Sequence, residues 1–173
     1  MLWPRLAKSL FSRPLTDPAP AVPDEAVQQL VAQLEAAAKT RLGRSLTLRQ
    51  VDAGSCNGCE LEINALGNVI YDLERFGLKF TASPRHADVL LVTGPLTRNM
   101  RAALERAWDC TPEPKWLVAV GDCAVDGGVF KGSYGIEGGI GAAIQPDLVI
   151  TGCPPTPTQM LEGLLALLAA QKR

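Results

Sequence analysis

The sequence predicts an α/β fold in which helices cover both faces of a parallel sheet. The first reason is that apolar runs of strand length alternate along the chain with stretches of helical periodicity, a pattern typical of parallel sheets. The second is that Val89–Val92 and Leu117–Val120 are apolar at every position, as expected of strands that are covered on both faces. A chain of 173 residues is long enough for one domain of this kind.

Residues 1–23 are expected to form an arm outside the domain, which then covers residues 24–173. Proline is dense in this arm and prevents a continuous helix, at Pro4, Pro14, Pro18, Pro20 and Pro23. Apolar residues recur among basic ones from Leu2 to Leu10, which is typical of a short amphipathic segment at an interface. Two interpretations stay open: the arm docks on a partner subunit or a membrane surface, or it is a frayed terminus.

The domain is expected to begin with an amphipathic helix. Apolar residues follow the i, i+3, i+4, i+7 pattern at Val27, Leu30, Val31, Leu34, Ala37 and Ala38. Asp24 is available as the N-cap, and Gly43 is placed to end the helix. The segment Leu46–Val51 then has the length of a strand, and a helix is expected over Glu60–Arg75.

The rest of the chain continues this alternation. Four further strands are expected, at Leu78–Thr81, Val89–Thr93, Trp116–Val120 and Leu148–Ile150. Helices are expected over Asn99–Trp108 and Thr158–Ala170.

Charge and cysteine usage exclude several classes of protein. Lys and Arg number 17 and Asp and Glu 18, so no basic excess indicates nucleic acid as the main partner. The five cysteines are an odd number, and we expect neither a secretory signal nor a twin-arginine leader, so a disulfide framework is not expected. The longest apolar stretch, Met160–Ala170, is too short to cross a bilayer.

Four of the five cysteines follow predicted strands. Cys56 and Cys59 come after the first strand, Cys123 after Trp116–Val120 and Cys153 after the last strand. Because the carboxyl ends of parallel strands meet at one edge of a sheet, we expect these four thiols at a common edge, where ligands of such folds bind. Cys110 follows a helix instead, and we expect it to be no ligand.

The chemistry of this constellation stays open from the residues alone. A C-x-x-C pair such as Cys56 and Cys59 serves as a redox pair, as half of a zinc site or as part of an iron–sulfur site. Cys153 followed by Pro154 is typical of the last ligand of iron–sulfur proteins. Iron–sulfur is favoured over structural zinc because zinc fingers usually place two close pairs of ligands.

Four segments in order resemble the signatures of a known family. They are Gly54–Ile63 (GSCNGCELEI), Gly121–Ala124 with Gly127–Phe130, Ser133–Tyr134, and Gly152–Pro157 (GCPPTP). These segments resemble those of the family that unites the [NiFe] hydrogenase small subunit with its counterpart in NADH-quinone oxidoreductase (complex I). The resemblance implies a flavodoxin-like fold and one [4Fe–4S] cluster on Cys56, Cys59, Cys123 and Cys153.

One segment separates the branches of this family. Asn57 and Gly58 stand between Cys56 and Cys59, whereas the complex I counterpart has two adjacent cysteines there. The spacer is similar to that of energy-converting, membrane-bound hydrogenases such as formate hydrogenlyase. Since the chain ends 20 residues after Cys153, we expect it to hold the proximal cluster alone.

The resemblance also implies a role and partners. The chain would be a non-catalytic electron-transfer subunit that relays electrons to or from a nickel–iron site in a hydrogenase or complex I-like large subunit. A ferredoxin-like iron–sulfur subunit and membrane subunits would complete a complex, with this chain peripheral at the cytoplasmic face of the inner membrane. Two alternatives stay open: a complex I-like subunit that passes electrons to quinone, and a structural zinc-binding module.

Residues near the cysteines carry further expectations. Glu60 follows the second cysteine, and it is either a proton relay with a pKa raised by burial or a first-turn acid that favours the helix dipole. Hydrogen bonds to cluster sulfur are expected from four backbone amides, those of Asn57, Gly58, Ala124 and Gly152. The glycines between 127 and 141 fit no phosphate-binding motif and indicate a surface loop, and His86 is expected to be a solvated loop residue.

Overall fold

A computed structural model of the chain describes residues 25–170. The predicted arm of residues 1–23 and the predicted N-cap Asp24 lie outside the described residues. Within residues 25–170, no helix combines the length and the apolar character that crossing a bilayer requires.

The five-stranded sheet is parallel throughout and has the strand order β2-β1-β3-β5-β7. Its strands are β1 (Thr47–Asp52), β2 (Lys79–Phe80), β3 (Val89–Thr93), β5 (Trp116–Val120) and β7 (Leu148–Ile150). Counted along the chain, these five strands lie in the order 2-1-3-4-5, which is the flavodoxin-like order. The predicted fold class is therefore confirmed.

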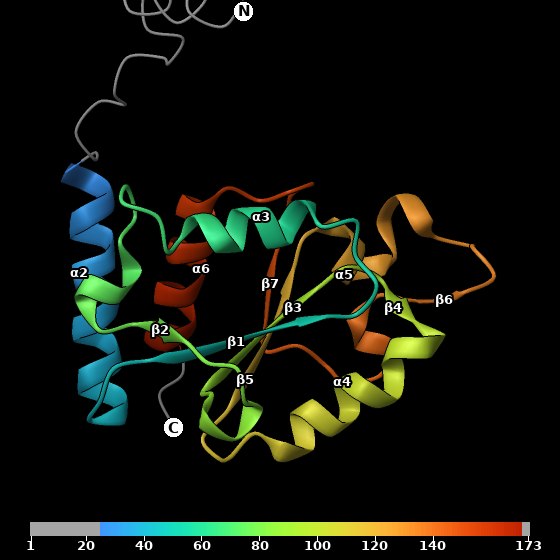
Figure 1. The fold of residues 1–173 in the computed structure, drawn as a ribbon, viewed down its shortest axis with the longest axis horizontal. Helices are drawn as coiled ribbons and strands as arrows, with labels where there is room; N and C mark the ends of the chain where they lie inside the picture. The colour runs from blue at the N-terminus through green and yellow to red at the C-terminus, as the bar shows by residue number, and fades with distance from the viewer. Residues whose placement is uncertain (1–24, 171–173) are drawn as a thin grey trace, which may run out of the picture.

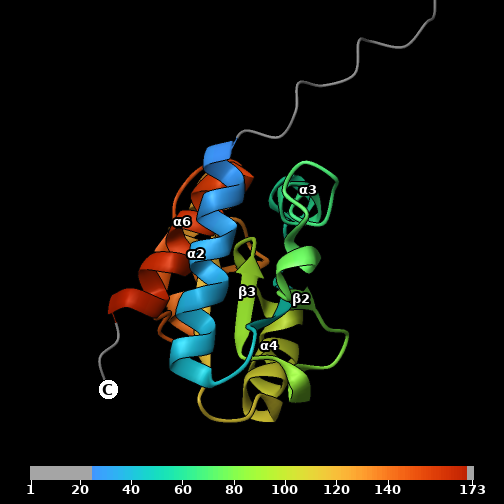
Figure 2. The same ribbon diagram turned by 90° about the vertical axis from the view of Figure 1, so that its left-hand side faces the viewer.

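Helices cover both faces of this sheet (Figures 1 and 2). On one face lie α2 (Glu25–Leu42), α3 (Gly58–Ala65) and α6 (Pro157–Ala170); α4 (Arg98–Cys110) and α5 (Asp122–Asp126) lie on the other. Neighbouring strand residues alternate between two hydrophobic clusters. Leu91 and Val118 pack beneath α2 and α6, whereas Leu90 and Leu117 pack beneath α4. This arrangement explains why β5 is apolar at every position and why β3 is apolar at every position except the buried Thr93.

The predicted helix over Glu60–Arg75 is wrong beyond its first two turns. The helix α3 ends at Ala65, and a separate 3-10 turn, η1 (Leu73–Phe76), follows. The side-chain Oδ1 of Asn68 accepts hydrogen bonds from the amides of Ile70 at 2.8 Å and Tyr71 at 3.1 Å. This local turn replaces the helical bonds that those amides would otherwise donate, which is how Asn ends helices.

A small second sheet was not predicted. The strands β4 (Leu96–Thr97) and β6 (Ile136–Gly138) pair antiparallel, with short 3-10 turns η3 (Gly128–Phe130) and η4 (Ile140–Ala142) on either side of β6. The glycine-rich segment is therefore partly a strand rather than a loop throughout. The two strands are too short for a sequence pattern to reveal them.

Candidate functional site

Four cysteine side chains line one small pocket beyond the carboxyl ends of the parallel strands. The pocket has a volume of about 110 Å³, and its lining includes Cys56, Cys59, Cys123 and Cys153. They come from three strand-to-helix connections, those from β1 to α3, from β5 to α5 and from β7 to α6 (Figure 1). Cys56 and Cys153 lie in the loops themselves, whereas Cys59 and Cys123 lie in the first turns of α3 and α5. Cys123 is buried, Cys59 is partly buried, and the other two are exposed.

The first of these loops is shaped by Asp52. Its Oδ1 atom accepts hydrogen bonds from the amides of Gly54 and Ser55, both at 2.7 Å. The hydroxyl of Ser55 in turn accepts a hydrogen bond from the amide of Asn57 at 3.1 Å. Asn57 adopts the left-handed conformation (φ 72°), which Asn tolerates better than most residues, and α3 begins directly after it.

The second and third loops are tied to each other. The amide of Asp122 donates to the carbonyl of Gly152 at 2.9 Å, and the amide of Gly152 donates to Oδ1 of Asp122 at 2.8 Å. The amide of Gly121 donates to the carbonyl of Ile150 at 2.8 Å and extends the pairing of β5 and β7 into the loops. The residues that precede Cys123 and Cys153 therefore hold one another in register.

Gly121 also brings the first loop close to the second. A Cβ atom at Gly121 would lie 2.5 Å from the sulfur of Cys59, a contact too short for any side chain. Gly121 has φ +90°, so the backbone conformation excludes larger residues as well. The sequence of the β5–α5 loop thus leaves room for the Cys59 thiol beside it.

The thiols influence one another electrostatically. Burial is the main cause that raises the pKa of the Cys59 thiol from 9.0 to about 12, and the charges of Glu60 and of the three other cysteines contribute to the same rise. Burial also raises the pKa of Cys123, although an amide hydrogen bond from Val129 partly opposes this rise. Four thiolates in one pocket therefore repel each other, and a cationic group between them would relieve that repulsion.

This electrostatic coupling predicts the pH dependence of Cys59 alkylation in the metal-free chain. The thiolate is the reactive form, so a pKa near 12 keeps the alkylation of Cys59 slow in the folded chain. The rate is expected to climb through pH 10, whereas in urea it levels off above the ordinary pKa of 9.0. Iodoacetamide trapping with mass spectrometry measures both curves.

The raised pKa of Cys59 also determines in which direction the stability of the folded chain changes with pH. The folded chain favours the protonated thiol of Cys59. The contribution of this thiol to the free energy of unfolding is therefore fully present below pH 9.0 and is lost as the pH rises from 9.0 towards 12. A rate of Cys59 alkylation that levels off near pH 9 in the folded chain would contradict the raised pKa.

Glu60 is a buried carboxylate with an incomplete set of partners. Its side chain is 5% exposed, and its Oε1 atom accepts a hydrogen bond from the Ser55 hydroxyl at 2.5 Å. Its Oε2 atom is buried and has no hydrogen-bond partner among the described residues. An unpaired buried carboxylate oxygen is costly, and such groups concentrate at functional sites.

Three of the four amides expected to bond to sulfur donate elsewhere. The amide of Asn57 donates to the Ser55 hydroxyl, that of Ala124 to the carbonyl of Gly121, and that of Gly152 to Asp122. The expectation is therefore wrong for these three, because the loops use the amides to hold their own shape. Gly58 remains a candidate donor.

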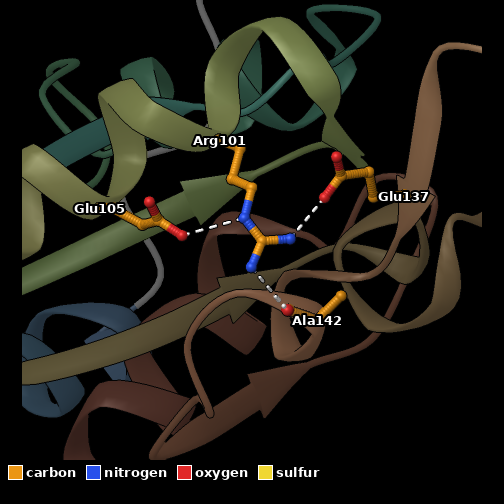
Figure 3. A network of polar contacts seen from close by, with 4 residues as sticks. All are labelled: Arg101, Glu105, Glu137 and Ala142. Carbon is orange, nitrogen blue, oxygen red and sulfur yellow. Dashed lines mark hydrogen bonds and ion pairs between the residues drawn. The ribbon is translucent and has the colours of Figure 1, made fainter.

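A polar network ties the second sheet to α4 (Figure 3). The guanidinium of Arg101 donates to Glu105 at 3.0 Å, to Glu137 of β6 at 2.6 Å and to the carbonyl of Ala142 at 3.4 Å. Hydrogen bonds to Glu137 and Glu105 raise the pKa of Arg101, so it stays charged. Beside it, Thr97 of β4 donates twice to the carbonyl of Ala53, at 3.0 Å and 2.8 Å, three residues before Cys56.

Two residues that were not expected to be ligands, Cys110 and His86, lie outside the cysteine pocket. Cys110 is exposed at the end of α4 and does not line the cysteine pocket. His86 is exposed, as predicted for a loop residue, at the end of the 3-10 turn η2 (Pro84–His86). Sequence reasoning missed Asp52, although an Asp two residues before Gly54-Ser55 is a signal for a turn of this kind.

The four thiols of the pocket do not form a compact group of metal ligands. Within residues 25–170, no three His, Cys, Asp or Glu side chains gather closely enough to hold a metal ion. The four thiols instead surround a small volume.

Comparison with known proteins gives one family match and several relatives. Residues 56–167 match the family described as NADH ubiquinone oxidoreductase, 20 Kd subunit. The chain is 44% identical over 137 residues to formate hydrogenlyase subunit 7 of Escherichia coli (strain K12), covering 79% of this chain and 54% of that protein. The chain thus spans about half the length of this relative.

For two other relatives, the aligned region covers similar shares of this chain and of the relative. The probable membrane-bound hydrogenase subunit mbhJ of Pyrococcus furiosus is 42% identical over 127 residues, which cover 73% of this chain and 76% of that protein. An NADH-quinone oxidoreductase subunit of Citrifermentans bemidjiense is 45% identical over 109 residues, which cover 63% of this chain and 64% of that protein.

A solved structure has the same fold. A chain from the structure of the membrane-bound sulfane sulfur reductase, described as an archaeal respiratory membrane complex, superimposes with a TM-score of 0.65 and 30% sequence identity. The match covers 80% of this chain and 74% of that chain.

Proposed function

The chain belongs to the family of the NADH ubiquinone oxidoreductase 20 Kd subunit, and we propose that it carries the proximal [4Fe–4S] cluster of a multisubunit membrane-bound [NiFe] hydrogenase. The observation that carries this proposal is the pocket lined by four cysteines from three separate loops. The relatives named as hydrogenase and quinone oxidoreductase subunits support an electron-transfer role. The Asn57-Gly58 spacer favours the hydrogenase branch over the quinone branch.

The donor set supports a cluster rather than zinc. A zinc ion needs four ligands at roughly 2.0–2.3 Å from a single point. A cubane cluster binds each of its thiolates through a different iron atom, so its ligands stand farther apart around a larger body. In this proposal Cys56, Cys59, Cys123 and Cys153 are the four ligands. When bound, the cluster supplies one-electron chemistry, and no residue of this chain breaks a bond.

The loops around the cysteines have a defined task in this proposal. They hold four thiols around a preformed volume, so that little reorganisation accompanies binding. Burial of Cys59 and Cys123 keeps water away from the proposed cluster. A poorly hydrated site favours the form of the cluster that carries the smaller net charge. Because burial raises the pKa of both thiols and so favours their protonated forms in the metal-free chain, incorporation of the metal must release protons.

Iron and sulfide analysis tests the cluster directly. The full chain, purified without oxygen, is expected to contain iron and acid-labile sulfide in equal amounts and to give the paramagnetic resonance signal of a reduced [4Fe–4S] cluster. Stoichiometric zinc without such a signal would instead support the alternative of a structural zinc module.

Partners and location follow from the same proposal. A hydrogenase large subunit would cover the cysteine pocket, with a ferredoxin-like subunit and membrane subunits farther out, and the chain would be peripheral at the cytoplasmic face of the membrane. The copurified large subunit decides between branches, since a nickel–iron site requires paired C-x-x-C motifs near both of its ends. A large subunit that lacks these motifs and reduces quinone would favour the complex I-like alternative.

We also propose Glu60 as a proton relay beside the cluster. The carboxylate is buried, its Oε2 atom lacks a partner among the described residues, and it directly follows the ligand Cys59. A buried carboxyl group of this kind can take up and release a proton as the charge beside it changes. A hydroxyl donor at Ser55 holds its other oxygen in place.

Glu60→Gln is expected to lower hydrogen turnover by the assembled complex by about tenfold or more, because glutamine cannot carry the proton. The pH profile of turnover is expected to shift, while the resonance signal of the cluster is retained. The matched control is Glu62→Gln, on the same helix and partly exposed. Turnover and a pH profile equal to those of the unmodified complex would leave Glu60 as a structural helix acid.

A further inference from the structure

A second pocket lies at the opposite end of the sheet from the cysteines. It has a volume of about 440 Å³. Its charged and polar lining consists of Arg44, Thr47, Lys79, Thr81, Arg85 and His86. Most of these residues precede or begin β1, β2 and β3, so the pocket lies where the strands start.

Three basic side chains, Arg44, Lys79 and Arg85, line this pocket in a chain whose formal net charge is −1. Within the described part of the chain, no carboxylate lines the pocket. Lys79 and Arg85 form no ion pair with an acidic residue between 25 and 170. Two positive side chains without an acidic partner among the described residues therefore line one concave site, beside the ion pair of Arg44 and Asp88.

Arg44 is held rigidly at the rim of this pocket. Its guanidinium donates two hydrogen bonds to the carboxylate of Asp88, at 2.7 Å and 2.5 Å. Asp88 is 1% exposed and also accepts a hydrogen bond from the amide of Thr47 at 2.8 Å. Two of the five N–H donors of Arg44 are used in this pair, which leaves three for another acceptor.

We propose that this pocket binds a phosphate group. A fixed guanidinium, an ammonium group, a second guanidinium and threonine hydroxyls are the donors that phosphate oxygens accept from in proteins. At about 440 Å³, the pocket has room for a phosphate group together with part of the molecule that carries it. The phosphate belongs either to the headgroup of an anionic phospholipid or to a soluble phosphate compound.

The site is independent of the proposed cluster. The five residues of β3 separate the edge that carries Arg85 from the edge that carries Gly94 and the cysteines. At roughly 3.3 Å per residue, this strand spans about 16 Å. A change at Lys79 or Arg85 is therefore expected to leave the iron content of the chain unchanged.

Titration calorimetry of the full chain with inorganic phosphate and with pyrophosphate tests the proposal. Saturable binding that weakens with added salt is expected. The double variant Lys79→Ala/Arg85→Ala is expected to bind at least about tenfold more weakly, because two charge-assisted hydrogen bonds are lost. Both side chains are exposed, so the fold tolerates the change. The control is Arg106→Ala, an exposed arginine of α4 outside the pocket.

Vesicles identify the source of the phosphate. The chain is mixed with vesicles of phosphatidylcholine alone or with an equal amount of phosphatidylglycerol. If the chain sediments with the anionic vesicles and pyrophosphate abolishes this sedimentation, the phosphate belongs to a lipid headgroup. If the chain binds pyrophosphate but does not sediment with the vesicles, the phosphate belongs to a soluble ligand. Absence of saturable binding to phosphate, pyrophosphate and anionic vesicles overturns the proposal, and so does equal binding by the double variant.

Discussion

Replacing Cys123 with alanine is expected to abolish stable cluster binding by the full chain. Cys123 is the one buried cysteine of the pocket, and the Asp122–Gly152 hydrogen bonds hold its loop against the loop of Cys153. Loss of a ligand removes an iron–sulfur bond and leaves three thiolates around an incomplete centre. Iron content is expected to fall at least about tenfold, because losing a ligand costs no less than losing a supporting hydrogen bond, which itself costs about tenfold or more in metal affinity.

The matched control for this variant is Cys110→Ala. Cys110 is exposed at the end of α4 and does not line the pocket, so iron and sulfide content should equal that of the unmodified chain. Circular dichroism of both variants shows whether the fold is kept. Equal loss of iron in both variants, or full iron content in Cys123→Ala, would contradict the ligand set.

The fold was predictable where one physical signal was strong. The uninterrupted apolar runs Val89–Val92 and Trp116–Val120 are short for helices and fit strands that are buried on both faces, and the structure has them so. The helix over Glu60–Arg75 failed because helical periodicity continued past Asn68, whose side chain competes for the backbone amides. Periodicity reports which face is buried, but it does not register such local competition.

The site was predictable in outline and not in detail. Cysteines that follow parallel strands meet at one edge whatever the loops do, so the pocket could be inferred from Cys56, Cys123 and Cys153. The hydrogen bonds within the loops could not be inferred, and this is why the amides of Ala124 and Gly152 were misassigned. The pair of Arg101 and Glu137 spans 36 residues and depends on a second sheet that the sequence does not reveal.

Gly94→Ala is expected to destabilise the chain and to displace the first cysteine loop. Gly94 follows β3 with φ +76°, and a Cβ atom there would lie 2.5 Å from the amide nitrogen of Ser55 and 2.6 Å from its Cα atom. These are backbone atoms, and the hydrogen bonds that the amides of Gly54 and Ser55 donate to Asp52 resist their movement. Steric overlap of about 1–3 kcal/mol therefore adds to a left-handed backbone cost of about 1–2 kcal/mol.

Gly43→Ala separates these two contributions. Gly43 also has a positive φ, +69°, but nothing lies within 4 Å of a Cβ atom at that position. Urea unfolding of the metal-free chain is expected to show a loss of about 1–2 kcal/mol for Gly43→Ala, and a clearly larger loss for Gly94→Ala. Iron content should fall in Gly94→Ala alone, because Ser55 directly precedes the proposed ligand Cys56. Equal destabilisation of the two variants, with iron content kept in both, would mean that the close approach of Gly94 to the cysteine loop does not exist.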